Sequence, residues 1–62
     1  MPAGKSEAII EYTRVGNSVR VTAVDVETGT EVVFQAPVTA SQADMQRTAI
    51  NKLKYVLGKQ KT

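Results

Sequence analysis

The chain has 62 residues, a net charge of +2, and neither cysteine nor histidine. A chain of this length supports one domain and buries only about 60% of its unfolded surface, so self-association is one way to gain stability. Without cysteine and histidine there is no disulfide, no thiolate zinc site, no thiol nucleophile and no histidine base, so we expect a protein that is not an enzyme and needs no cofactor.

The first part of the chain is predicted to form a β-hairpin. Residues 1–6 are small and polar, and we expect a disordered N-terminal tail there. Glu7–Val15 and Ser18–Val26 are rich in β-branched and aromatic residues, which is typical of strands. Between them, Gly16-Asn17 favours a two-residue hairpin loop. With this loop the predicted pairs are Tyr12–Val21 and Ile10–Ala23.

A third strand is predicted over Thr30–Ala36, and it ends at Pro37 because proline cannot continue a ladder. Thr28-Gly29 is the turn signal between the second and third strands. A two-residue loop at this position pairs Ala23 with Phe34. A three- or four-residue loop with a bulge at the glycine is also compatible with the sequence, so the loop type stays open.

The pattern of side chains collects small and apolar residues on one face of the predicted sheet. Successive side chains of a strand point to opposite faces, and residues directly opposite each other share a face. The set on this face is Ala8, Ile10, Tyr12, Val19, Val21, Ala23, Val32, Phe34 and Ala36. We therefore predict an α+β fold, a three-stranded antiparallel β-meander with one C-terminal α-helix packed across one face (β-β-β-α), as a single domain over residues 7–58.

The covering helix is predicted over Ser41–Leu57. At about 100° per residue, its apolar side chains fall in one stripe, formed by Met45, Ala49, Ile50, Leu53, Val56 and Leu57. Ser41 is a favourable N-cap residue. Gly58 follows the stripe, where a left-handed C′ residue commonly ends a helix. Residues 59–62 are then predicted to be a disordered basic tail.

The other face of the predicted sheet carries Ile9, Val24 and Val33 as direct cross-strand neighbours. Isolated exposed apolar residues are ordinary on a solvated sheet, which is one interpretation. The other interpretation is a contact surface, because three adjacent exposed apolar residues form a small apolar patch. In addition, the first and third strands are sheet edges that could each accept a strand from a partner. We expect a protein-interaction module whose partner is a second copy or another, unknown protein.

The C-terminal part of the chain is basic. Residues 45–62 carry five cations and no acid, whereas residues 1–44 carry three cations and six acids. These cations either complement the helix dipole on a solvated face or contact phosphates, which would make the protein an accessory nucleic-acid binder. The candidate contact residues are Arg47, Lys54, Lys59 and Lys61. Only Tyr55 offers a stacking surface nearby, so nucleic-acid binding is the less favoured alternative.

The chain has no apolar run near the ~18 residues that a membrane helix requires. Its start lacks the basic segment and apolar core of a secretory signal. We therefore expect a soluble, cytoplasmic protein without a membrane partner.

Four segments carry a resemblance to known sequences. They are Val15–Val19 at the first loop, Val21–Ala23, Thr28–Val32 at the second loop, and Lys52–Gly58 near the C-terminus. Through them the chain resembles a family of short bacterial proteins of unknown function, over nearly all of its predicted ordered part. The resemblance implies a bacterial, cytoplasmic setting, and it implies no activity, cofactor or site.

Overall fold

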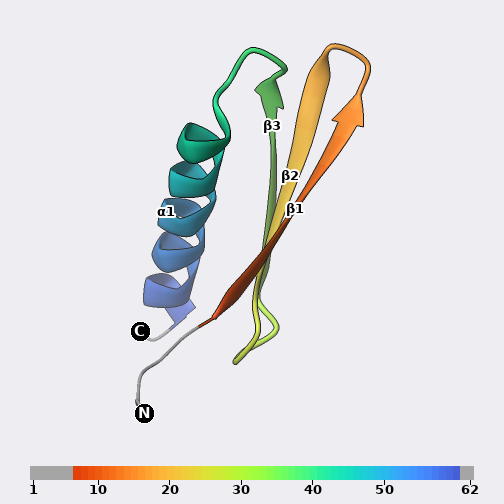
Figure 1. Cartoon of the computed structure of the whole chain (residues 1–62). Coiled ribbons are helices and arrows are strands. Elements are labelled where there is room, and N and C mark those ends of the chain that lie inside the picture. Colours follow the sequence, from red (N-terminus) through yellow and green to blue (C-terminus); the bar gives the residue numbers. More distant parts are fainter. Residues whose placement is uncertain (1–6, 61–62) are drawn as a thin grey trace.

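The computed structural model describes residues 7–60 of the chain. Three strands, β1 (Ala8–Val15), β2 (Ser18–Asp25) and β3 (Glu31–Pro37), precede one helix, α1 (Gln42–Gln60). The strands form an antiparallel sheet in the order β1-β2-β3, and α1 lies across one face of it (Figure 1). The predicted β-β-β-α fold is confirmed. The tail predicted for residues 1–6, and residues 61–62 of the C-terminal tail, lie outside the described residues.

The first hairpin has the predicted register. Tyr12 pairs with Val21, and Val15 pairs with Ser18 to close a two-residue loop. Gly16 has a φ of 61°, and the described residues include no other residue type with a positive φ. Glycine adopts this conformation without a Cβ clash, and glycine at the first loop position is typical of a type II′ turn. The local sequence therefore determines this turn directly.

The second hairpin differs from the predicted register by two residues. Val21 pairs with Phe34, and Ala23 pairs with Val32, so the predicted Ala23–Phe34 pair is wrong. A shift of one residue would have moved every side chain of β3 to the opposite face. A shift of two leaves each side chain on its predicted face, and the predicted core is preserved.

A four-residue loop with a left-handed glycine causes this shift. The N–H of Asp25 donates to the carbonyl of Thr30 at 2.7 Å, and the N–H of Gly29 donates to the carbonyl of Asp25 at 2.7 Å. Gly29 has a φ of 77°. The side chain of Asp25, only 2% exposed, accepts the backbone N–H of Thr28 at 3.0 Å and its hydroxyl at 2.8 Å. This buried carboxylate holds the longer loop in place.

The core lies between α1 and the sheet. Val21, Ala23 and Ala49 are fully buried, and Leu53 is 3% exposed. All nine sheet residues predicted for this face belong to the core or pack against it: Ala8, Ile10, Tyr12, Val19, Val21, Ala23, Val32, Phe34 and Ala36. Ala23 of β2 and Ala49 of α1 carry only a methyl group each, which allows α1 to approach the central strand closely.

The helix begins as predicted and ends later. The N–H of Asp44 donates to Oγ of Ser41 at 3.1 Å, which is the predicted N-cap. Gly58 lies inside α1, which continues to Gln60, so the predicted stop after Leu57 is wrong. Lys59 therefore belongs to the helix and not to a disordered tail. Its ammonium lies 5.4 Å from the ring centre of Tyr55, one turn earlier, and this contact stabilises the last turn.

Candidate functional site

The sheet face turned away from α1 is the first candidate surface, and we call it the open face. Alternate residues of the three strands form it, because side chains in a strand alternate between faces. Its residues are Ile9, Glu11 and Thr13 of β1, Arg20, Thr22 and Val24 of β2, and Glu31, Val33 and Gln35 of β3.

The three apolar residues of the open face are adjacent, although not in the predicted arrangement. Ile9 lies directly opposite Val24, as predicted. Val33 lies opposite Thr22, so the predicted direct pair of Val24 with Val33 is wrong, and the two are diagonal neighbours. Diagonal side chains about 7–8 Å apart still interact. Ile9 is 56% exposed and Val33 is 54% exposed.

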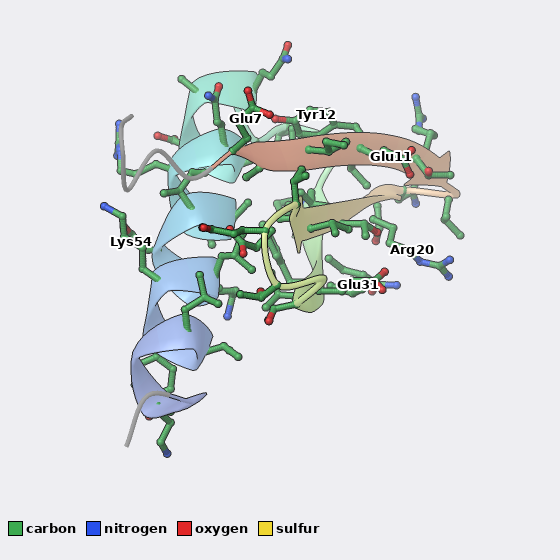
Figure 2. All side chains as sticks on the ribbon, turned by 90° about the horizontal axis from the view of Figure 1, so that it is seen from below. Glu7, Glu11, Tyr12, Arg20, Glu31 and Lys54 are labelled. Carbon is green, nitrogen blue, oxygen red and sulfur yellow. The ribbon has the colours of Figure 1, made fainter. Side chains whose placement is uncertain are left out.

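The open face also carries charges of both signs. Glu11, Arg20 and Glu31 come from three different strands, and their side chains lie on the side of the sheet away from α1 (Figure 2). Within residues 7–60, none of these three charges has an ion-pair partner. Glu31 lies directly opposite Val24, so an acid borders the apolar residues. The open face is thus amphiphilic, with an apolar centre and charged borders.

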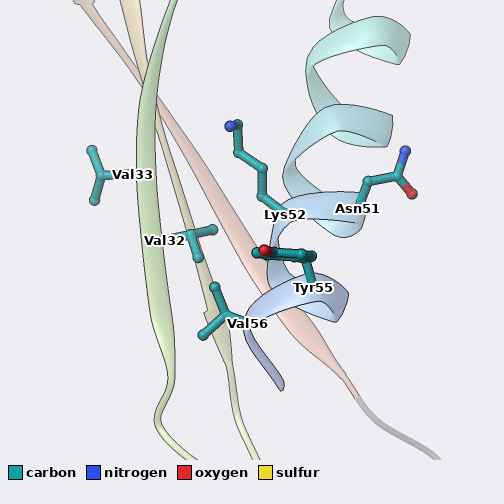
Figure 3. A pocket seen from close by; sticks show the side chains of 6 residues that line it. All are labelled: Val32, Val33, Asn51, Lys52, Tyr55 and Val56. Atoms are coloured by element: carbon teal, nitrogen blue, oxygen red, sulfur yellow. The ribbon is translucent and has the colours of Figure 1, made fainter. Parts of the chain in front are cut away.

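A second surface, which the sequence did not predict, is an open groove between β3 and α1, here called the edge groove. Its volume is about 530 Å³, and its lining residues are Val32, Val33, Asn51, Lys52, Tyr55 and Val56. Figure 3 shows Val32 and Val56 turned toward each other, with Tyr55 beside them and Val33 pointing to the opposite side of β3. Tyr55 is 66% exposed. The helical pattern placed it among the polar residues of α1, near the cations, so the sequence contained no signal for this groove.

The edge groove carries positive charge over an apolar floor. The ammonium of Lys52 lies 5.7 Å from the ring centre of Phe34, and that of Lys59 lies near Tyr55. None of the six residues that line the groove is acidic. Such a groove favours a ligand with apolar groups and a negative charge.

A smaller hollow of about 240 Å³ lies on the other side of α1, beside β1. Ile10, Leu53 and Leu57 belong to its walls, and they are also part of the core or its border. Asp25 borders this hollow, but its carboxylate already accepts two hydrogen bonds from Thr28. The role of Asp25 is therefore structural.

The predicted cationic residues do not form one surface. Arg47 contacts Asp44, with its Nη1 3.5 Å from the carboxylate Oδ1, and both side chains are about two-thirds exposed. Lys54 is exposed two turns further along the same side of α1, because seven residues complete about two turns. Lys59 is turned to the Tyr55 ring. Lys61 lies outside the described residues.

Residues 7–60 contain no group of three metal-binding side chains that could hold an ion. In the same part of the chain, α1 is too polar to cross a lipid bilayer.

Comparison with known proteins gives a family and no activity. A model of a domain of unknown function, DUF6898, matches residues 5–61, which include all three strands, α1, the open face and the edge groove. No curated protein and no solved structure matches the chain. The predicted kinship with a family of unknown function is thus confirmed, and the chain belongs to the DUF6898 family.

Proposed function

We propose that the protein is a small, non-enzymatic interaction module that associates with a second copy through the open face. The observation that carries the proposal is the exposure of Ile9 and Val33, both more than half exposed, beside Val24 on the sheet face that α1 leaves uncovered. Burying this centre between two copies would add apolar contact area to a chain whose own core is small. A bacterial, cytoplasmic setting is part of the same proposal.

The charges of the open face support a second copy as the partner. Ile9, Val24 and Glu31 form one row across the three strands of the open face. Along β2, Arg20 lies on one side of Thr22, and this row lies on the other. A two-fold axis that crosses the strands near Thr22 brings Arg20 of each copy over the row of Ile9, Val24 and Glu31 in the other. The same axis brings the two Glu11 side chains close to each other, so the attraction between Arg20 and Glu31 has to exceed this repulsion. The interface is then self-complementary and closed, because each copy contributes the same residues.

Light scattering coupled to size exclusion measures the molar mass in solution and so tests the association. Concentrations from about 10 μM to 1 mM cover the Kd values of weak complexes. We expect the mass to rise with concentration above the 6.7 kDa of one chain. The double variant Ile9→Thr/Val33→Thr should weaken association about tenfold or more, since each change occurs twice in the interface. Val26→Thr is the matched control, because Val26 is 51% exposed but lies in the second loop.

A charge reversal tests the geometry of the pair. Arg20→Glu should weaken association, and adding Glu31→Arg should restore it, because each copy then carries the exchanged pair. A monomer at every concentration, or equal effects of the double variant and Val26→Thr, would contradict the proposal.

Accessory nucleic-acid binding is the second candidate, supported by the exposure of Arg47 and Lys54 on one side of α1. The nearby Asp44 carboxylate offsets part of this charge, so we rank it lower. A mobility shift at low salt that disappears at high salt would support it. The absence of any shift at low salt would exclude it.

A further inference from the structure

The two edges of the sheet differ in their protection against pairing with another strand. Between Glu31 and Pro37, β3 consists of five uncharged residues, Val32–Ala36. The other edge, β1, carries Glu11 and Arg14 within its length. Charges and prolines on an edge strand prevent unwanted pairing, and a long uncharged edge is a template for an added strand. The edge formed by β3 is therefore the more receptive one.

The alternation of hydrogen bonds identifies which groups of β3 are available. In an antiparallel pair, every second residue bonds its partner strand and the residues between them point outward. The bond from Asp25 to Thr30 fixes this alternation for the second hairpin. The N–H and C=O groups of Val33 and Gln35 consequently point away from β2. Pro37, which has no N–H, ends this series.

A strand added at this edge would also meet the edge groove. Strands pair about 4.8 Å apart, and alternate side chains of an added strand would turn to the side of the sheet that carries α1. There they would contact Val32, Tyr55 and Val56, which line the groove. Lys52 lies over Phe34, two residues along β3 from Val32, and gives this position a positive charge.

We propose that β3 and the edge groove bind an extended segment of another protein by strand addition. In this segment an apolar and an acidic side chain face the groove two positions apart, the first opposite Val32 and the second near Lys52. Backbone bonds to Val33 and Gln35 provide affinity, and the two groove-facing side chains provide specificity. This site differs from the proposed self-association, because it uses the backbone edge of β3 and the edge groove; Val33 is the residue that both share.

The probe is a capped seven-residue peptide with threonine at positions 1, 3, 5 and 7 and with valine, glutamate and valine at positions 2, 4 and 6. Titration into the isotope-labelled full chain, at protein concentrations where it is monomeric, is followed by amide chemical shifts. We expect saturable shifts at Val33, Gln35 and Tyr55, and small shifts at Ile9 and Arg47. Methylating the peptide amides that face β3 should abolish the shifts without any change to the protein.

Matched variants separate the contributions of charge and backbone. Lys52→Gln should weaken binding about two- to fivefold, the range of an exposed ion pair, whereas Lys54→Gln on the outer side of α1 should not change it. Gln35→Pro removes an outward N–H without removing a ladder bond and should weaken binding at least fivefold relative to Gln35→Thr. Amide spectra of each variant establish that it is folded.

Three results would overturn the proposal. The first is the absence of shifts up to millimolar peptide. The second is an equal response to the peptide and its N-methylated form. The third is a set of shifts confined to β1 and β2, with none in β3 or at Tyr55. Because the assay uses the monomeric chain, failure of self-association leaves these outcomes unchanged.

Discussion

Replacing the buried carboxylate of the second hairpin tests the physical account of its register. Asp25 is 2% exposed, and its Oδ2 accepts both the backbone N–H and the hydroxyl of Thr28. Asp25→Ala removes both bonds and leaves the N–H of Thr28 without this acceptor. The hydroxyl of Thr28 still has a partner in the variant, because its Oγ1 lies 2.7 Å from Oγ1 of Thr30, to which it can donate once Asp25 is gone.

The expected loss of stability follows from these contacts. A hydrogen bond to a charged group contributes about 1.5–3 kcal/mol, and two are lost. The loss is reduced because the exposed loop lets water reach Thr28 and because the buried carboxylate is no longer desolvated. We therefore expect Asp25→Ala to lower the free energy of unfolding by about 2 kcal/mol, which corresponds to a Tm lower by about 8–16 °C for a domain of this size.

Urea unfolding followed by circular dichroism measures this change, and an unchanged m-value would indicate that only stability is altered. Glu27→Ala is the control, because Glu27 lies in the same loop and is exposed, and it should change stability by less than about 0.5 kcal/mol. If the alanine variant does not fold, Asp25→Asn replaces it in the measurement, because its side chain keeps one acceptor oxygen. Equal stabilities of Asp25→Ala and Glu27→Ala would refute the reasoning.

Two further predictions use the same assay. Leu53→Ala should cost about 2–4 kcal/mol, because Leu53 is 3% exposed in the centre of the core, and a cost below 1 kcal/mol would contradict the packing of α1 on the sheet. Gly29→Ala should cost about 1–2 kcal/mol, since Gly29 has a φ of 77°. Gly58→Ala should instead stabilise by about 0.5–1 kcal/mol, because Gly58 is helical and an added Cβ meets nothing within 4 Å. If Gly58→Ala is instead destabilised, Gly58 ends the helix in solution, as the sequence predicted.

The sequence was sufficient for the first hairpin and for the two faces of the sheet. Gly16-Asn17 is a local signal whose turn type fixes the register of β1 and β2 without reference to the rest of the chain. The alternation of Ile10, Tyr12 and their partners then assigns one face to the core. Both inferences depend on neighbouring residues only, and both are confirmed.

The register of the second hairpin could not be predicted in this way. A shift of two residues leaves every side chain on the same face, so the apolar pattern fits both registers equally well. The choice depends on Asp25, whose carboxylate holds the four-residue loop from a buried position. Likewise, the edge groove depends on where α1 crosses the sheet, which the pattern of residues along α1 does not determine.

The observed register has consequences for function. In the predicted register Val33 would extend the row of Ile9 and Val24 across the sheet, and the patch would be wholly apolar. In the observed register Glu31 occupies that place beside Val24. In the proposed dimer, an acid at the border of the patch would orient the second copy, because Arg20 would approach the row of Glu31 only if the two-fold axis runs across the strands. In the proposed dimer, an apolar row alone would permit several registers, whereas the charged border would favour one of them.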